Sequence, residues 1–145
     1  MKNEERRKAI TCKKMNLKDG YIHETAGSTK RFCQFLFLNP ETVTEYKHWH
    51  NSRHIWKEIP EGIRRAGILD MEIYVVSDMA FMILEVPLDF DWDESFGRLA
   101  TYERQAEWEK FVAPFQRVKD GQRSEEKWQL MERIFSLTDA LNNKS

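Results

Sequence analysis

The chain of 145 residues is poor in cysteine, with only two, and it contains no run of about 18 consecutive apolar residues. Cys12 and Cys33 are too few for a disulfide framework and show no CxxC spacing, so we expect both to be free thiols. The sequence offers no candidate membrane span, and its charged first 14 residues lack the apolar core of a signal peptide. These absences predict a cytoplasmic protein that does not bind a membrane.

An excess of one charge is also missing, because 23 basic side chains stand against 24 acidic ones. That balance argues against nucleic acid as the main partner. The content of 41% hydrophobic and 32% charged residues is typical of a soluble globular protein with one domain. We expect residues 1–29 to form an N-terminal arm, residues 30–138 the folded domain and residues 139–145 a C-terminal tail.

Apolar patterning predicts four strands. Residues 31–38 form a short apolar and aromatic run, typical of a buried strand. Residues 71–76 alternate apolar and polar side chains, residues 80–86 are almost wholly apolar, and Ser77 and Asp78 between them predict a β-hairpin. Residues 128–137 supply a last strand with a less regular pattern.

Two helical regions separate these strands. Asn39 and Pro40 suit the N-cap and the first residue of a helix, because the N–H group that proline lacks would be unpaired there. A second helical piece follows and ends at Gly67, and residues 96–115 form the other helical region. The acidic run over residues 89–94 lacks the glycine and the final glutamate of an EF-hand, so we expect a solvated loop.

The order strand, helix, strand, strand, helix, strand predicts an α+β fold, the ferredoxin-like βαββαβ sandwich, in which two helices cover one face of an antiparallel sheet. The strands over residues 31–38 and 80–86 are apolar on both faces. The second face therefore needs a cover, and a second copy of the chain would supply it. We expect a homodimer.

Three of the four histidines, His48, His50 and His54, fall within seven residues. Tyr46 and His50 are four apart, so they lie on one face of a helix, and His50 and His54 repeat the spacing unless the helix breaks near residues 51–52. Histidine exchanges a proton near neutral pH. The cluster predicts proton-transfer chemistry.

A longer pattern begins with Tyr46, His50 and Asn51 and continues with Ile55, Trp56 and Glu58. After these residues come a helix that ends in glycine, a hairpin, and the segment from Gln105 to Trp108. Over about residues 31–137, in order, this pattern resembles that of the L-rhamnose mutarotase family. The resemblance implies a dimeric ferredoxin-like α/β barrel that acts without a cofactor or metal on the anomeric carbon of 6-deoxyhexoses, with Tyr46 and His50 serving the proton transfers.

The same chemistry suggests which other residues bind the monosaccharide. Trp56 and Trp108 would supply apolar surface for the C–H face and the methyl group of the sugar. Glu72, Tyr74 and Glu85 are polar side chains on apolar strands and would bind hydroxyl groups. His54 is a further candidate, and either His50 or His54 could be the main acid–base residue.

Three departures from the family pattern bear on the substrate. Trp56 lies six residues after His50 instead of four, Glu107 precedes Trp108 where the family often has adjacent tryptophans, and Met71 stands where it often has a tyrosine. These changes fall in the expected sugar pocket. We therefore keep L-rhamnose and L-fucose as alternative substrates.

Two other kinds of function remain open. His50 and His54 could ligate a metal, although the sequence HNSRH lacks the glutamate of HExxH and no third ligand is obvious. The chain could also be a non-mutarotase member of the same fold, either a cofactor-independent oxygenase or a small-ligand-binding protein, because fold does not determine function.

Overall fold

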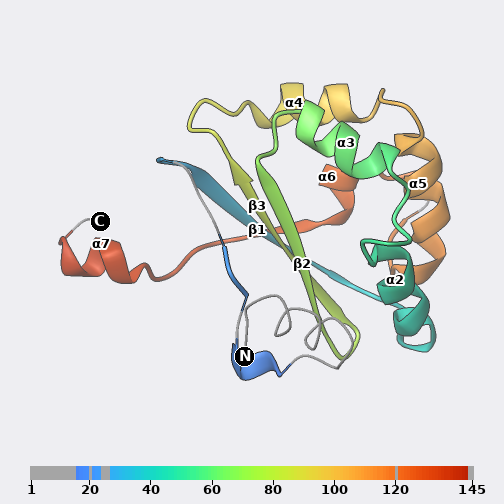
Figure 1. The fold of residues 1–145 in the computed structure, drawn as a ribbon, viewed down its shortest axis with the longest axis horizontal. Coiled ribbons are helices and arrows are strands. Elements are labelled where there is room, and N and C mark those ends of the chain that lie inside the picture. The colour runs from blue at the N-terminus through green and yellow to red at the C-terminus, as the bar shows by residue number, and fades with distance from the viewer. Residues whose placement is uncertain (1–15, 20, 24–26, 120, 144–145) are drawn as a thin grey trace, which may run out of the picture.

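A four-stranded antiparallel sheet in the order β2-β3-β1-β4 forms the centre of the computed structural model, which describes residues 16–19, 21–23, 27–119 and 121–143 (Figure 1). The strands are β1 (Lys30–Phe37), β2 (Asp70–Val76), β3 (Met79–Val86) and β4 (Gln129–Met131). This order, with helices between β1 and β2 and between β3 and β4, is that of the ferredoxin-like sandwich. The predicted fold is confirmed.

The helices that connect the strands lie on one side of this sheet (Figure 1). Between β1 and β2 come the 3₁₀ turn η2 (Pro40–Thr42), α2 (Val43–His50) and α3 (Glu58–Arg65). Between β3 and β4 come α4 (Trp92–Leu99), α5 (Gln105–Val112), η3 (Ala113–Phe115) and α6 (Ser124–Lys127). The remaining elements are η1 (Leu17–Asp19) and α7 (Leu137–Leu141).

The register of the central strands decides which side chains face the helices. Gln34 pairs with Met82, and Met82 pairs with Ile73, so the residues two positions away on each strand share this face. Leu36 and Leu84 on this face are buried against the helices and form the core with Tyr46. The intervening residues point to the other face, which we call the open face because no helix of the described chain covers it.

Several local predictions are confirmed. The hairpin of β2 and β3 turns at Ser77 and Asp78, and Ser77 has a φ of 54°. Gly67 has a φ of +100°, the left-handed conformation that glycine tolerates after a helix end. Asn39 precedes the helical turn as predicted, but its side-chain amide donates to the carbonyl of Pro114 and does not cap the helix.

The second helical region differs from the prediction, because it consists of α4 and α5 as separate helices. Arg104 stands between them with a φ of 64°, a left-handed conformation that a continuous helix excludes. The helical region also begins earlier, at Trp92. The Asp91 side chain accepts a hydrogen bond from the Glu94 N–H at 3.0 Å and caps α4, so part of the acidic run is a helix start and not a solvated loop.

The last strand is much shorter than residues 128–137. β4 pairs with β1 at three positions only, Cys33 to Phe35, and the chain then leaves the sheet toward α7, which projects away from the body (Figure 1). Four apolar side chains of this C-terminal segment are exposed: Ile134, Phe135, Leu137 and Leu141. Of the apolar residues that suggested a strand, Leu130 and Met131 lie in β4, whereas Ile134 and Phe135 lie beyond it and are exposed.

Described parts of the predicted N-terminal arm lie against the open face near β2. The rings of Tyr21 and Tyr74 are 5.6 Å apart, and His23 forms ion pairs with Asp70 and Glu85. The rest of the open face is apolar around Phe35. The open face thus has a polar end contacted by the arm and an apolar end.

Candidate active site

A cavity of about 870 Å³ lies between the helices and the covered face of the sheet. Its size is within the range of small-molecule sites. Helices α2, α3 and α5 and strands β2 and β3 all contribute to its wall, with Tyr46, His50, Trp108, Gln116, Met71, Ile73 and Met82 among the lining residues. Tyr46, His50 and Trp108 were all predicted from the sequence as site residues.

Tyr46 and His50 occupy successive turns of α2, and Tyr46 is 1% exposed. Their rings lie 4.1 Å apart between centroids. His50 Nδ1 is 2.8 Å from the carbonyl oxygen of Tyr46, so Nδ1 carries the ring proton and donates a hydrogen bond to that carbonyl. The other ring nitrogen, Nε2, is therefore left with a free lone pair.

Burial lowers the pKa of His50 below its ordinary 6.5, and the hydrogen bond to the Tyr46 carbonyl opposes this shift in part. The imidazole is then neutral at pH 7. A neutral imidazole with a free Nε2 can accept a proton, which is the state that a general base requires.

The pKa of the Tyr46 hydroxyl is shifted in the opposite direction to that of His50. Burial raises its pKa well above the ordinary value of 10.0, the nearby Gln116 side chain opposes the shift, and the charge of Glu109 adds to it. Tyr46 therefore stays protonated and acts as a hydrogen-bond donor. Among the described residues, neither the Tyr46 hydroxyl nor Gln116 Oε1 has a hydrogen-bond partner, although both atoms are buried.

The unpaired Tyr46 hydroxyl and Gln116 Oε1 each cost free energy of folding, since burial removes their contact with water and no hydrogen bond replaces it. Gln116 is 5% exposed, and its backbone is held beside β1 by a bridge to Leu38. Both residues line the cavity. An unpaired hydroxyl and an unpaired amide oxygen together suit a ligand that is rich in hydroxyl groups.

Trp108 gives the cavity an aromatic wall, with its ring 5.2 Å from that of His50. Trp56 lies behind it, 5.2 Å from Trp108, and is not among the lining residues. The guanidinium of Arg104 stacks on Trp56 at 3.9 Å. Trp56 thus supports Trp108 in this structure and does not itself line the cavity.

His54 does not share the helix face of His50. Helix α2 ends at His50, as the possible break near residue 51 indicated, and His54 lies in the following turn. Its ring stacks on that of exposed His48 at 4.1 Å and does not line the cavity. The helical repeat is broken, so His50 and His54 do not form a ligand pair on one helix face.

Glu72, Tyr74 and Glu85 lie on the open face, on the side of the sheet opposite Tyr46 and His50. The register decides this, because Glu72 pairs with Ile83 while its neighbour Ile73 lines the cavity. The structure does not bring these three side chains to the cavity. Strand residues alternate faces, and the sequence alone did not show which face would meet the helices.

Glu85 has a structural environment of its own. It accepts a hydrogen bond from Thr29 at 2.9 Å and lies 3.0 Å from His23 Nε2 and 3.6 Å from Arg31 Nε. Burial raises the pKa of this carboxyl, but these contacts outweigh burial and the net pKa is lowered. Glu85 therefore stays ionised and holds the N-terminal arm against the sheet.

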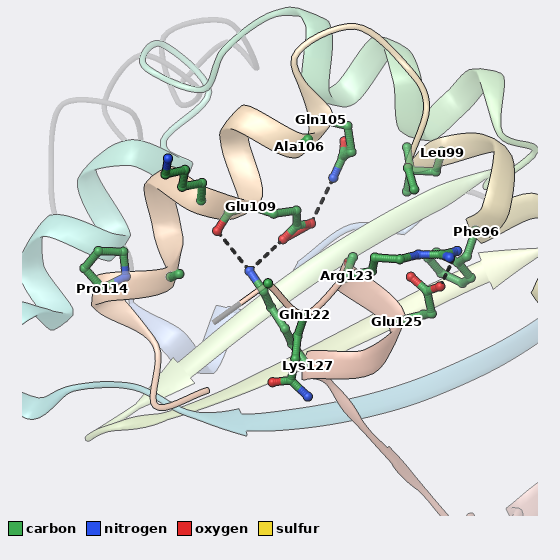
Figure 2. Close-up of a pocket in the computed structure, with 15 residues that line it drawn as sticks. Phe96, Leu99, Gln105, Ala106, Glu109, Pro114, Gln122, Arg123, Glu125 and Lys127 are labelled. Atoms are coloured by element: carbon green, nitrogen blue, oxygen red, sulfur yellow. Dashed lines mark hydrogen bonds and ion pairs between the residues drawn. The ribbon is translucent and has the colours of Figure 1, made fainter. Parts of the chain in front are cut away.

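Sequence reasoning missed Gln116 and a polar network on α5. Glu109 accepts hydrogen bonds from Gln105 at 2.9 Å and from buried Lys127 at 2.9 Å (Figure 2). Gln105 and Glu109 line both the cavity described above and a second one of about 710 Å³. No motif signals this network, because Lys127 is 18 residues from Glu109 in the sequence.

The chain matches the family model described as L-rhamnose mutarotase over residues 31–137. It belongs to the L-rhamnose mutarotase family. A curated relative, the L-fucose mutarotase of Xanthomonas campestris pv. campestris, is 31% identical over 79% of this chain and 94% of its own length. Members of this family are isomerases that interconvert sugar anomers, so the chain is a sugar mutarotase and the resemblance noted from the sequence is confirmed.

Solved structures support the same fold. An L-rhamnose mutarotase from Formosa agariphila superimposes with a TM-score of 0.57 at 20% identity, over 74% of this chain and 98% of that one. A type-II polyketide cyclase, the tetracenomycin F2 cyclase of Streptomyces glaucescens, gives 0.50 at 15% identity over 74% and 95%. These likenesses confirm the ferredoxin-like dimeric α/β barrel fold, while mutarotase-family membership disfavours the oxygenase and ligand-sensor alternatives.

Proposed function

We propose that the protein interconverts the α and β anomers of a 6-deoxyhexose, with L-fucose preferred over L-rhamnose, and that His50 and Tyr46 are its catalytic residues. The observation that carries the assignment of residues is the pair itself. His50 presents an unprotonated Nε2, and Tyr46 an unpaired hydroxyl, in one cavity of suitable size. The L-fucose mutarotase relative and the changed residue Met71, which lines the cavity, support the choice of sugar. Glu107 is exposed and is not among the lining residues, so the expectation that it falls in the sugar pocket is wrong.

Anomer exchange requires opening and closing of the pyranose ring. His50 Nε2 removes the proton from the anomeric hydroxyl, the C1–O5 bond breaks, and an aldehyde forms at C1. The Tyr46 hydroxyl donates a hydrogen bond to O5 as negative charge develops there. The imidazolium then returns its proton to O5, the aldehyde rotates, and the reverse steps close the ring on the other face, with no net gain or loss of protons.

Trp108 and Gln116 complete the proposed site. The Trp108 ring offers an apolar surface for the C–H face of the sugar. Gln116 Oε1 is a buried acceptor without a partner among the described residues, and a sugar hydroxyl would satisfy it. Met71, where the family often has a tyrosine, places an apolar thioether in the same cavity.

The test is saturation transfer between the anomeric proton signals of equilibrated L-fucose and L-rhamnose, with and without protein. We expect faster exchange for L-fucose than for L-rhamnose. With His50→Ala, we expect an exchange rate close to that measured without protein. Faster exchange with L-rhamnose would overturn the choice of sugar and leave the mechanism standing. Full activity of His50→Ala would overturn the catalytic assignment.

We also propose that the protein is a homodimer in which the open faces of two sheets pack together. The apolar end of the open face carries Phe35, whose ring contacts those of Phe37 and Phe81, and Phe37 is 44% exposed. The C-terminal segment adds four further exposed apolar side chains. Apolar surface of this extent favours association with a second copy.

The dimer is tested by sedimentation of Phe81→Asp. A charge in the middle of the apolar end should shift the protein from dimer to monomer, because an unpaired carboxylate is costly in an apolar interface. Leu88→Asp is the control, since Leu88 is an exposed apolar residue in the loop after β3. A wild-type protein that sediments as a monomer would contradict the proposal.

Within the described ranges, no helix combines the length and the apolar character that crossing a membrane requires. We propose a cytoplasmic location, which the free thiol of Cys33 supports because reducing compartments keep thiols unpaired. Fractionation of cells that express the protein would test it.

A further inference from the structure

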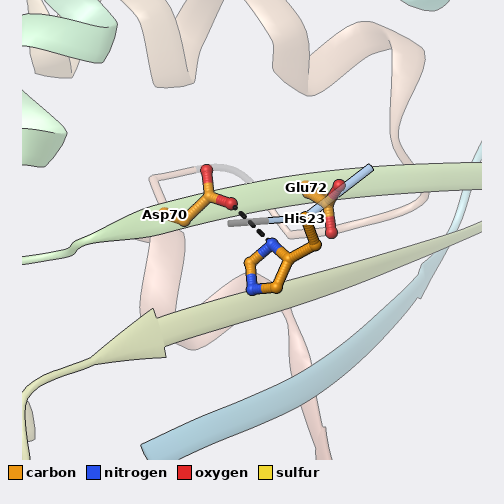
Figure 3. Close-up of side chains that lie close together, drawn as sticks. All are labelled: His23, Asp70 and Glu72. Atoms are coloured by element: carbon orange, nitrogen blue, oxygen red, sulfur yellow. Dashed lines mark ion pairs between the residues drawn. The ribbon is translucent and has the colours of Figure 1, made fainter. Parts of the chain in front are cut away.

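His23, Asp70 and Glu72 come together at the polar end of the open face (Figure 3). Each contributes one nitrogen or oxygen atom to a group whose members all lie within 4.8 Å of one another. His23 comes from the N-terminal arm, and the two carboxylates come from β2. The cluster lies on the opposite side of the sheet from His50.

The imidazole of His23 is oriented by a residue outside this group. Its Nε2 lies 3.0 Å from the carboxylate of Glu85, which is 6% exposed, while Nδ1 faces Asp70 at 3.5 Å. With its proton on Nε2, His23 donates to Glu85 and turns the lone pair of Nδ1 toward the other two carboxylates. A histidine held by a carboxylate behind it is the arrangement that orients many metal-binding histidines.

The two carboxylate oxygens of Asp70 also have different partners. Oδ1 accepts the N–H of Met71 at 3.0 Å, which leaves Oδ2 directed at His23. Both oxygens of Glu85 are engaged, one with Thr29 and Arg31 and the other with His23. Glu85 therefore acts as a support, and the candidate ligand atoms are His23 Nδ1, Asp70 Oδ2 and a carboxylate oxygen of Glu72.

The charge at this end of the sheet is unbalanced. Asp70, Glu72 and Glu85 bring three carboxylates, and among the described residues their ion-pair partners are His23, which is neutral when Nδ1 carries a lone pair, and Arg31. Arg31 is 61% exposed and contacts Glu85 alone. A divalent cation between Asp70 and Glu72 would compensate the remaining negative charge.

We propose that His23, Asp70 and Glu72 bind one divalent first-row metal ion, with zinc as the best match, and that the ion fastens the N-terminal arm to the sheet. One nitrogen and two carboxylate oxygens, with water as a further ligand, suit zinc. The role is structural. Asp70 also borders the proposed catalytic cavity, whereas His23 and Glu72 are not among its lining residues.

The test uses the full-length protein after treatment with a chelator, titrated with zinc chloride in a calorimeter. We expect one equivalent to bind with micromolar affinity and to raise the thermal midpoint, because an ion that binds only the folded state stabilises it. His23→Gln should weaken binding at least about tenfold, since it removes the nitrogen ligand. Glu72→Gln should also weaken zinc binding. In limited proteolysis, zinc should protect the N-terminal arm of the wild type but not that of the variants.

Two controls make the result specific. The double variant His48→Gln/His54→Gln removes a stacked pair of surface histidines that is not part of the proposed metal site, and it should bind zinc as the wild type does. His23→Gln should keep its anomer-exchange rate and its circular dichroism, which separates loss of the metal from loss of the fold. Equal zinc affinity in His23→Gln, or no stoichiometric binding by the wild type, would overturn the proposal and leave His23 as an ion-pairing residue only.

Discussion

His50 Nδ1 lies 2.8 Å from the backbone carbonyl of Tyr46, one helical turn earlier. This single contact sets the tautomer of the imidazole and leaves Nε2 with a free lone pair in a residue that lines the cavity. It also makes the two catalytic candidates interdependent, because the residue that presents the hydroxyl also orients the base. A substitution that preserves the backbone of Tyr46 should therefore leave His50 oriented.

Removal of the imidazole should abolish most of the rate acceleration. We expect His50→Ala to lower kcat by about 10²–10⁴-fold, the usual contribution of a positioned general base, while the fold is retained. Tyr46→Phe should lower kcat less, because it removes one hydrogen bond and keeps the backbone carbonyl. His54→Ala is the control and should keep the wild-type rate. Anomer exchange by NMR measures all three, and a larger loss in His54→Ala than in His50→Ala would reverse the assignment.

The rate should depend on pH through His50. Because its folded-state pKa lies below the ordinary 6.5, the neutral base predominates at pH 7 and is lost as the pH falls through the lowered pKa. We expect kcat/KM to be flat near neutrality and to decline at acid pH, after subtraction of spontaneous exchange. The lowered pKa also makes the protein less stable in acid. The contribution of His50 to the free energy of unfolding is complete above its unfolded-state pKa and declines as the pH falls toward its folded-state pKa. A rate that rises on acidification would argue for an imidazolium acid instead.

Gln116 offers a test that separates binding from stability. Gln116→Leu removes a buried acceptor that has no partner among the described residues, so its stability should be unchanged or higher. Its kcat/KM should nevertheless fall by about 5–30-fold, the equivalent of one lost hydrogen bond to a sugar hydroxyl. Gln105→Leu is the matched control, because its amide is bonded to Glu109 and its loss should reduce the thermal midpoint. Unchanged kinetics in Gln116→Leu would exclude contact with the sugar.

The Lys127–Glu109 pair should be sensitive to loss of one partner. The Lys127 side chain is 1% exposed and that of Glu109 16%. Lys127→Met leaves the Glu109 carboxylate without its main cation, which we expect to cost about 3 kcal/mol in the free energy of unfolding. The double variant Lys127→Met/Glu109→Gln should recover much of this loss. Urea denaturation measures both, and equal stability of the two variants would show that the pair is not coupled.

Much of the fold follows from local sequence. The run of residues 31–38, the hairpin around Ser77 and Asp78, and the glycine at position 67 predict β1, β2, β3 and the end of α3 because each depends on neighbouring residues only. The split between α4 and α5 did not follow, since residues 100–108 contain neither glycine nor proline and only the left-handed backbone of Arg104 shows the break. The short β4 did not follow either, because apolar side chains after Met131 suit a strand equally well as an exposed segment.

The candidate site also contains residues that the sequence predicted and residues that it did not. Tyr46 and His50 were predictable because a spacing of four places two side chains on one helix face, and both line the cavity in the structure. Gln116 was not predictable, since its place depends on the bridge of its backbone to Leu38, far away in the sequence. Glu72, Tyr74 and Glu85 were recognised as unusual, but their face of the sheet was not known.

By itself, the sequence determined the order of the elements, the family and the pairing of Tyr46 with His50, because these depend on short spacings along one chain. The tertiary structure decided which face of each strand meets the helices and which distant residues share a cavity. A strand presents alternate residues to opposite sides, so only the packing of helices on the sheet turns that alternation into an inside and an outside. That packing places Met71 and Ile73 at the cavity beside Tyr46 and His50, and it leaves Glu85 on the open face, where it contacts Thr29 and His23 of the N-terminal arm.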